Sequence, residues 1–246
     1  MMTRFPPLVM LLVLFLGFGC AHAPDEKAGK AEFHYKLAAN FFSDSNPQTA
    51  IKELYTALEY EPAHAKAQHL LGFIYFGRRD MRRALEHMRK AVAIDPNYDT
   101  AVANLGNLYL AMEDWATAVA YFKRLLDRPV YKTPYLAHNN LGWALYNLGR
   151  YEEAKTHYDM AIFLNPKMCL AHNNAGRLYA HLGDTKLALN HFDKAISLCP
   201  NYAEPHYFLG RIHAALSSPK RAREHYARCM KIAPEAPYGR RCSEAL

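Results

Sequence analysis

The sequence predicts an all-α protein: a right-handed solenoid of six helical hairpins, with twelve helices in all, and a short capping helix at the C-terminus. Three observations lead to this prediction. A proline recurs every 34 residues through most of the chain, small residues recur at fixed positions between the prolines, and large apolar residues recur at others. Such a period is typical of stacked units, each too small to bury its own apolar face.

The composition narrows the class of protein. Of 246 residues, 51% are hydrophobic and 22% are charged, with a net charge of +7, which excludes a disordered chain. Five cysteines are too few for a small scaffold held together by disulfides. The sequence contains no nucleophile elbow, phosphate loop or zinc-ligand spacing, so we expect no enzyme activity, no small-molecule substrate and no metal or other cofactor.

The first element is an export segment. Residues 5–19 form an apolar run that follows Arg4 and ends at Cys20. Fifteen residues are too few to span a bilayer, which takes about 20, but fit the apolar part of a signal peptide. An apolar segment that ends on Gly19-Cys20 resembles a bacterial lipoprotein signal, which implies cleavage after residue 19 and a lipid on Cys20. The alternative is an ordinary signal peptide that happens to end at a cysteine.

A short linker follows. Residues 20–30 are small and polar, and ten extended residues reach at most ~33 Å. We therefore expect the folded part to stay near the membrane. Ala21, where some lipoproteins carry Asp, implies sorting to the outer membrane, with the protein facing the periplasm.

The repeats occupy the rest of the chain. The period from Pro62 to Pro96, and from Pro166 through Pro200 to Pro234, is 34 residues and resembles that of the tetratricopeptide repeat. We number six units, each with a helix A and a helix B, and a cap. They are 31–64, 65–98, 99–134, 135–168, 169–202 and 203–236, with the cap at 237–246.

Recurring residues mark the inside of each unit. Position eight is small, position twenty is alanine, and position twenty-four is large. At position eight stand Ala38, Gly72, Gly106, Gly142, Gly176 and Gly210, and at position twenty-four stand Leu54, Met88, Phe122, Tyr158, Phe192 and Tyr226. Position sixteen carries residues that cap helix N-termini, namely Asn46, Asp80, Asp114, Asp184 and Ser218.

Unit three departs from the pattern. Leu125 stands where alanine is usual. Residues 128–134 replace the regular ending of the unit and make it two residues longer. We therefore predict a local change of stacking between units three and four.

Four cysteines follow Cys20, all within the last 78 residues. Cys169 opens helix A of unit five and Cys199 closes helix B, and these ends are neighbours in an antiparallel hairpin. Cys229 lies in the last B helix and Cys242 in the cap. Of three connectivities, geometry favours Cys169–Cys199 and Cys229–Cys242. The alternative is buried free thiols.

Histidines and basic residues invite other functions. His34, His138, His172 and His206 share position four and are one unit apart, so packing is favoured over metal binding. Basic residues crowd unit two and the C-terminus. Nucleic acid is one interpretation, but an exported protein rarely meets it. We favour a solvated face, with an acidic partner or lipid headgroups as alternatives.

The concave face of helix A predicts the partner-binding groove. Exposed aromatic side chains are typical anchors for peptides, and asparagine can bond a peptide backbone. The predicted groove residues are Tyr35, Phe42, His69, Phe73, Phe76, Asn107, Leu110, Asn139, Trp143, Tyr146, Asn173, Arg177, Tyr207 and Arg211.

The chain from Cys20 onward resembles the pilotin lipoproteins of type IV pili, the family of PilF, PilW and Tgl. The local match is His138–Ala154 (HNNLGWALYNLGRYEEA), joined to six repeats and the lipoprotein-like signal. The resemblance implies an outer-membrane lipoprotein that binds secretin subunits and promotes their assembly into a ring. We expect no nucleic acid among its partners. A second hypothesis is a general periplasmic scaffold for envelope or peptidoglycan proteins.

Overall fold

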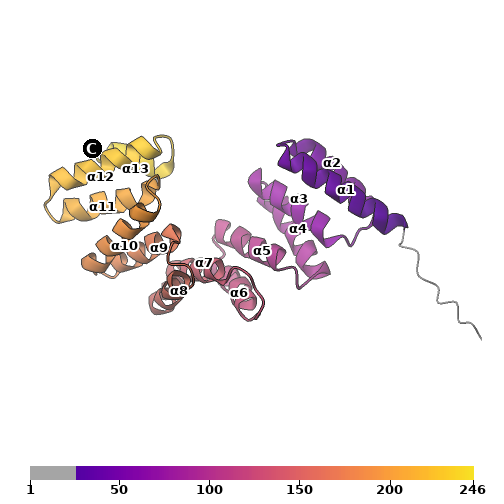
Figure 1. The fold of residues 1–246 in the computed structure, drawn as a ribbon, viewed down its shortest axis with the longest axis horizontal. Helices are drawn as coiled ribbons and strands as arrows, with labels where there is room; N and C mark the ends of the chain where they lie inside the picture. The colour runs from indigo at the N-terminus through magenta and orange to yellow at the C-terminus, as the bar shows by residue number, and fades with distance from the viewer. Residues whose placement is uncertain (1–25) are drawn as a thin grey trace, which may run out of the picture.

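A computed structural model describes residues 26–246, which form thirteen α-helices and no strand and so confirm the all-α fold class (Figure 1). Residues 1–25, with the predicted export segment and Cys20, lie outside the described residues. The helices are α1 (Glu26–Ser43), α2 (Pro47–Tyr60), α3 (Ala65–Gly77), α4 (Met81–Ile94), α5 (Asp99–Ala111), α6 (Trp115–Leu126), α7 (Pro134–Asn147), α8 (Tyr151–Leu164), α9 (Cys169–His181), α10 (Thr185–Leu198), α11 (Ala203–Ala215), α12 (Pro219–Ile232) and α13 (Pro237–Glu244).

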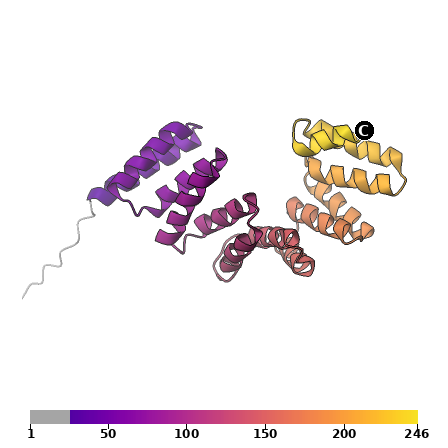
Figure 2. The ribbon, with the colours of Figure 1, turned by 180° about the vertical axis from the view of Figure 1, so that it is seen from behind.

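The helices pair as successive antiparallel hairpins along an arch, with α1 and α2 at one end and α12 and α13 at the other (Figures 1 and 2). Each hairpin is one predicted unit, and α13 packs against α12 and α11 as the cap. Helix α1 begins at Glu26, so the second half of the predicted linker is helical rather than extended.

The helix starts follow the predicted caps, with one exception. The side chains of Asn46, Asp80, Asp114 and Asp184 each accept the backbone N–H three residues ahead, at 3.0–3.2 Å. Ser218 makes no such bond, and Pro219 begins its helix instead. His64 caps α3 by accepting the N–H of Ala67 at 3.1 Å, a role not foreseen from the sequence.

In units two to six, the glycine at position eight lies directly under the large side chain at position twenty-four. A Cβ added to Gly142 would meet Tyr158 Cε1 at 2.7 Å and the carbonyl oxygen of Ala154 at 3.2 Å. Tyr158 is fully buried. Glycine is therefore required for the close approach of α7 and α8.

We expect Gly142→Ala to lower the free energy of unfolding by about 1–3 kcal/mol, since the methyl group would push Tyr158 from its buried position. Urea unfolding followed by circular dichroism measures the change. The control is Gly77→Ala, because a Cβ there meets no atom within 4 Å. Equal stability of the two variants would contradict the close-packing argument.

The junction of units three and four differs from the other junctions. Seven residues, 127–133, connect α6 to α7, whereas four residues connect the other B helices to the next A helix, as in 61–64. Helix α6 also packs more closely against α7 than the other B helices do against their next neighbour. Arg124 and Arg128 both donate to the carbonyl of Pro96, and Arg128 also pairs with Asp99. The stacking thus changes where the sequence departs from the repeat.

No helix among residues 26–246 combines the length and the apolar character needed to cross a bilayer.

Candidate binding site on the concave face

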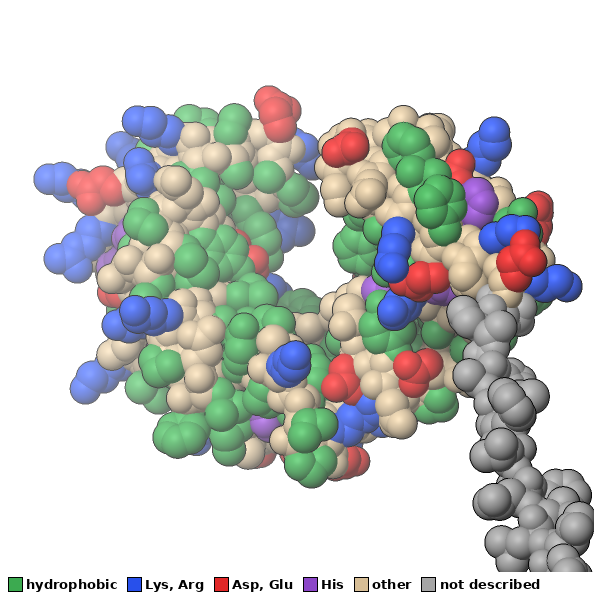
Figure 3. All heavy atoms as spheres, turned by 45° about the vertical axis from the view of Figure 1, so that its right-hand side comes forward, with side chains coloured by type: hydrophobic (Ala, Val, Ile, Leu, Met, Phe, Trp, Pro, Cys, Tyr) green, Lys and Arg blue, Asp and Glu red, His purple; other side chains and the backbone are tan. Residues whose placement is uncertain are grey.

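The inner side of the arch carries a cavity at its C-terminal end. The arch has two limbs, units one to three and units four to six, and the molecule is hollowed between them (Figure 3). The cavity has a volume of about 500 Å³ and is formed by the A helices α7, α9 and α11 with the start of α10. Its lining residues are Tyr146, Arg177, Ala180, His181, Thr185, Phe208, Arg211, Ile212, Ala215 and Leu216.

Arg177 is a fixed part of the cavity wall. Its Nη1 donates to Glu204 Oε1 at 2.8 Å, and its guanidinium lies 4.3 Å from the ring centroid of Trp143 and 5.3 Å from that of Phe208. Planar guanidinium groups stack well on aromatic rings. Because its charge is balanced by Glu204, Arg177 holds the aromatic side chains in place rather than offering a free charge.

Glu204 connects this wall to the cap. It also accepts hydrogen bonds from Tyr238 Oη at 2.9 Å and Tyr202 Oη at 3.2 Å. Burial, and then the charge of Glu204, raise the pKa of Tyr238 to about 12 and also raise the pKa of Tyr202. Both phenols therefore stay protonated donors at neutral pH. The sequence did not indicate Glu204, Phe208 and Tyr238, because helix positions alone do not show which side chains meet across units.

Arg211 supplies the available positive charge of the cavity. It is exposed, it makes no ion pair with the described residues, and its guanidinium lies 5.9 Å from the ring centroid of Tyr207. The rings of Tyr146 and Phe208 line the same cavity. This combination suits an extended segment that carries an acidic group next to an aromatic or aliphatic side chain.

Fewer of the predicted groove side chains in the first units are exposed than expected. Phe73 is 40% exposed and meets Phe42 edge-on at 5.9 Å between ring centroids. Phe76 is half-buried and packs on the core. His69 bonds Tyr98 Oη at 3.1 Å and Asn104 Nδ2 at 2.8 Å, so it belongs to the wall. Burial lowers the pKa of His69 to about 4.

Other predicted groove residues are half-buried within the stack. Tyr35 packs against His64, at 5.2 Å between ring centroids, Leu110 packs on the core, and Asn107 accepts a hydrogen bond from Asn140 Nδ2 at 2.8 Å.

Asn139 and Asn173 do not lie in an open groove, contrary to the prediction. Both are buried, at 1% and 0% exposure. Asn139 accepts a hydrogen bond from Asn174 Nδ2 of the next unit at 2.9 Å. Asn173 has no partner for either atom of its amide, because Phe208 stands in unit six where Asn174 stands in unit five. Asn139 therefore joins neighbouring units, and the burial of both amides keeps them from a peptide backbone.

A pair of histidines joins helix A to helix B in each of the last three hairpins. His138 meets His157, His172 meets His191, and His206 meets His225, with Nδ1–Nδ1 distances of 2.9, 3.2 and 3.1 Å. Each pair joins position four of helix A to position twenty-three of helix B. One Nδ1 must donate and the other accept, so in each pair at least the accepting ring must be neutral. The partner at position twenty-three was not foreseen, although His87, His157, His191 and His225 recur there.

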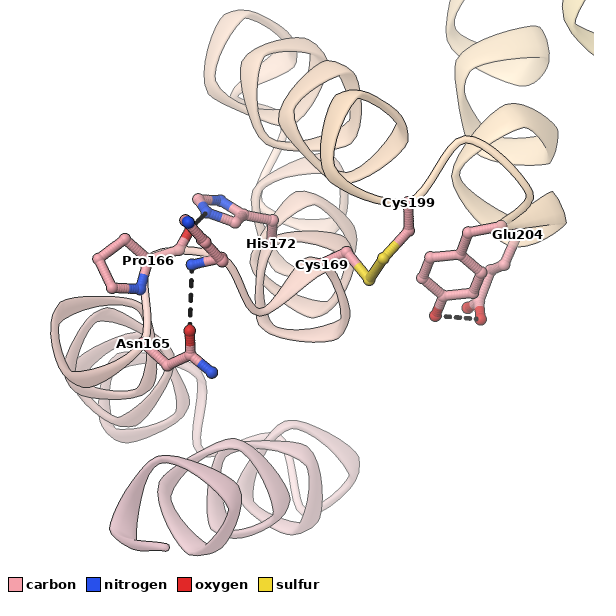
Figure 4. Close-up of a disulfide and its surroundings, with 8 residues drawn as sticks. Asn165, Pro166, Cys169, His172, Cys199 and Glu204 are labelled. Carbon is pink, nitrogen blue, oxygen red and sulfur yellow. Dashed lines mark hydrogen bonds between the residues drawn. A yellow bond between two sulfur atoms is a disulfide. The ribbon is translucent and has the colours of Figure 1, made fainter.

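The structure contains the disulfides Cys169–Cys199 and Cys229–Cys242, the pairs that hairpin geometry favoured. The first joins the start of α9 to the residue after α10 and lies beside Glu204 and its hydrogen bond from a tyrosine (Figure 4). The second joins α12 to α13. The first therefore supports helices that line the cavity, and the second holds the cap that carries Tyr238. Among residues 26–246, no group of three or more His, Cys, Asp or Glu side chains is placed to hold a metal ion.

Comparison with known proteins identifies the repeat. Tetratricopeptide repeat patterns match residues 35–99 and 104–168, residues 167–235, and residues 75–130. No curated protein sequence matches the chain.

Several solved structures have a similar fold. PilW, a widely conserved type IV pilus biogenesis factor, has a TM-score of 0.76 at 23% identity, over 86% of this chain and 97% of PilW. PilF of Pseudomonas aeruginosa has a TM-score of 0.74 at 16% identity, over 90% of this chain and 100% of the other. YrrB, a repeat protein with an unusual peptide-binding site, has a TM-score of 0.54 at 22% identity, over 78% and 97%. At these identities the likeness extends to the fold.

Proposed function

Since the chain belongs to the tetratricopeptide repeat family, we propose that it is a binding protein of type IV pilus biogenesis: a pilotin lipoprotein that binds secretin subunits and promotes their multimerisation into the outer-membrane ring. Within the pilotins, Tgl is the member we propose as its counterpart. The observation that carries this proposal is the fold similarity to PilW and PilF, which spans nearly the whole of both proteins.

The proposed mechanism is binding without catalysis. A lipid on Cys20 holds the arch at the periplasmic face of the outer membrane. The cavity of units four to six holds a segment of the secretin monomer, with Arg211 facing an acidic group and Tyr146 and Phe208 facing an apolar side chain. Holding monomers at one surface raises their local concentration and so favours assembly.

The test is the amount of heat-resistant secretin multimer in cells that lack the chromosomal copy of this protein. Arg211→Glu should weaken secretin capture at least about tenfold, since it replaces attraction by like-charge repulsion at the cavity. Helical content should not change, because Arg211 is exposed. Arg82→Glu, at an exposed position on α4 outside the cavity, is the matched control and should assemble normally.

Two further variants separate the parts of the proposal. The Cys20→Ala variant should be absent from the membrane fraction, and its cells should form no secretin multimer. The purified variant should still capture secretin. Phe73→Ala tests whether the N-terminal aromatic side chains contribute. Normal multimers in the deletion strain would contradict the pilotin function and favour a general periplasmic scaffold. Normal capture by Arg211→Glu would contradict only the assignment of the cavity.

A further inference from the structure

The outer face of α12 and α13 is strongly basic. Residues 219–246 contain seven basic and three acidic side chains, a net of +4 out of +7 for the whole chain. All seven basic side chains are exposed. They are Lys220, Arg221, Arg223, Arg228, Lys231, Arg240 and Arg241. Lys and Arg side chains extend along the outer edge of the limb that carries the C-terminus, at the left of Figure 3.

Helix periodicity gathers this charge on one side. Ala222, Tyr226 and Cys229 form the buried stripe of α12, and side chains three or four residues apart share a face. Lys220 and Lys231 lie on the opposite face, about 16 Å apart along the axis. The disulfide between Cys229 and Cys242 fixes α13 beside it. We call the outer surface of these two helices the basic face.

The basic face differs from the second basic cluster of the chain, on α4. There, Arg83 pairs with Asp80 at 2.5 Å, Lys90 pairs with Glu86 at 2.8 Å, and Arg89 donates to Tyr109. Much of the charge on α4 is therefore used within the fold.

No basic side chain of the basic face makes an ion pair with the described residues. Arg240 donates to the carbonyl of Glu235, and Arg241 lies 5.5 Å from the ring centroid of Tyr238. The remaining five make no hydrogen bond within the described residues, and the acidic Glu224 is the one carboxylate among them on α12, so the positive charges still repel one another. A surface of this kind gains most from an external anion.

We propose that the basic face binds the headgroups of an anionic phospholipid bilayer. The charges are spread over two helices, and the cavities beside them take in only one basic side chain each, Arg228 or Arg223. This spread suits mobile headgroups better than one acidic protein segment with a defined shape. Basic residues near an anionic bilayer contribute additively and through long-range attraction. This contact would fix how the arch stands on a membrane, and it does not depend on the identity of the client.

The test measures binding to vesicles by the chain from residue 20 onward with Cys20→Ser, so that no lipid is attached. The described helices bury their own core within residues 26–246, and circular dichroism checks folding. Vesicles contain either 30% phosphatidylglycerol in phosphatidylcholine or phosphatidylcholine alone, at about 0.15 M salt, where surface charges interact only within about 8 Å.

The variant Arg221→Gln/Arg228→Gln/Lys231→Gln should bind anionic vesicles about a hundredfold more weakly, since each basic residue is worth about a fivefold change. The matched control Arg78→Gln/Arg79→Gln/Arg82→Gln removes the same charge from the α4 region and should change binding less than about threefold. Equal losses in both variants would overturn the proposal, as would equal binding to neutral vesicles. Binding to a polyglutamate peptide but not to anionic vesicles would assign the face to an acidic protein instead.

Discussion

Replacing Cys169, Cys199, Cys229 and Cys242 by alanine is expected to lower the free energy of unfolding by about 6–7 kcal/mol. The bridges close loops with sequence separations of 30 and 13 residues. Loop-closure entropy in the unfolded chain gives about 3.6 kcal/mol for the first and about 2.9 kcal/mol for the second. The bridges lie in different units, so their effects should nearly add.

The repeat makes this experiment clean, because alanine occurs in at least one other unit at three of the four positions. Cys229 stands where Ala57, Ala91, Ala161 and Ala195 stand in other units, Cys169 where Ala31, Ala65 and Ala203 stand, and Cys199 where Ala233 stands. The substitution therefore removes the bond without leaving a foreign residue in the stack.

Urea unfolding measures the loss, with each pair removed separately as a control. Since neighbouring units stabilise one another in a stack of repeats, we expect units five and six to unfold first in the variant, which hydrogen exchange would reveal. A loss below about 1 kcal/mol for all four cysteines would show that the bridges contribute little to folding.

Acid is expected to unfold the last three units as the pH falls from about 6.5 towards 4. Burial is the largest cause that lowers the pKa of all six paired histidines, to about 4 for His138 and His206. Nearby cations act in the same direction, such as Lys123 on His157 and Lys194 on His172.

The direction follows from proton binding. The unfolded histidines have pKa values near 6.5, so between pH 6.5 and 4 the unfolded state binds more protons than the folded state. Stability that is present above pH 6.5 is therefore lost as the pH falls through this range. Below the folded pKa both states are protonated, and the loss stops growing.

Unit three supplies the matched control. Its residues at the two paired positions are Val102 and Tyr121, which cannot gain a positive charge. The variant His138→Val/His157→Tyr copies that arrangement into unit four. Circular dichroism followed from pH 7 to 4 should show unfolding at lower pH in the variant than in the wild type. Identical acid profiles would mean that other groups control acid stability.

The helices and their packing could be predicted from the sequence because each depends on residues close to one another in the chain. Asp80 caps α4 through an N–H three residues ahead, and Gly142 meets Tyr158 within one hairpin. Repetition over six units made these local patterns clear.

The binding surface was less predictable because it depends on contacts between units. Asn139 and Asn173 share position five with Tyr207, yet their burial follows from the next unit, where the facing residue is Asn174 in one case and Phe208 in the other. Similarly, Arg177 could be placed on the concave face, but its ion pair with Glu204 could not. A single sequence gives no register between side chains on successive A helices.

The seven-residue connection between α6 and α7 has a consequence for what the arch can hold. It joins the limb of units one to three to the limb of units four to six (Figure 1). Arg124 and Arg128 brace it by their bonds to Pro96. The distance between the two limbs therefore depends on this one connection. Inserting or deleting residues in the connection 127–133 would change the width of the segment that fits between the limbs, while every residue of the cavity stays the same.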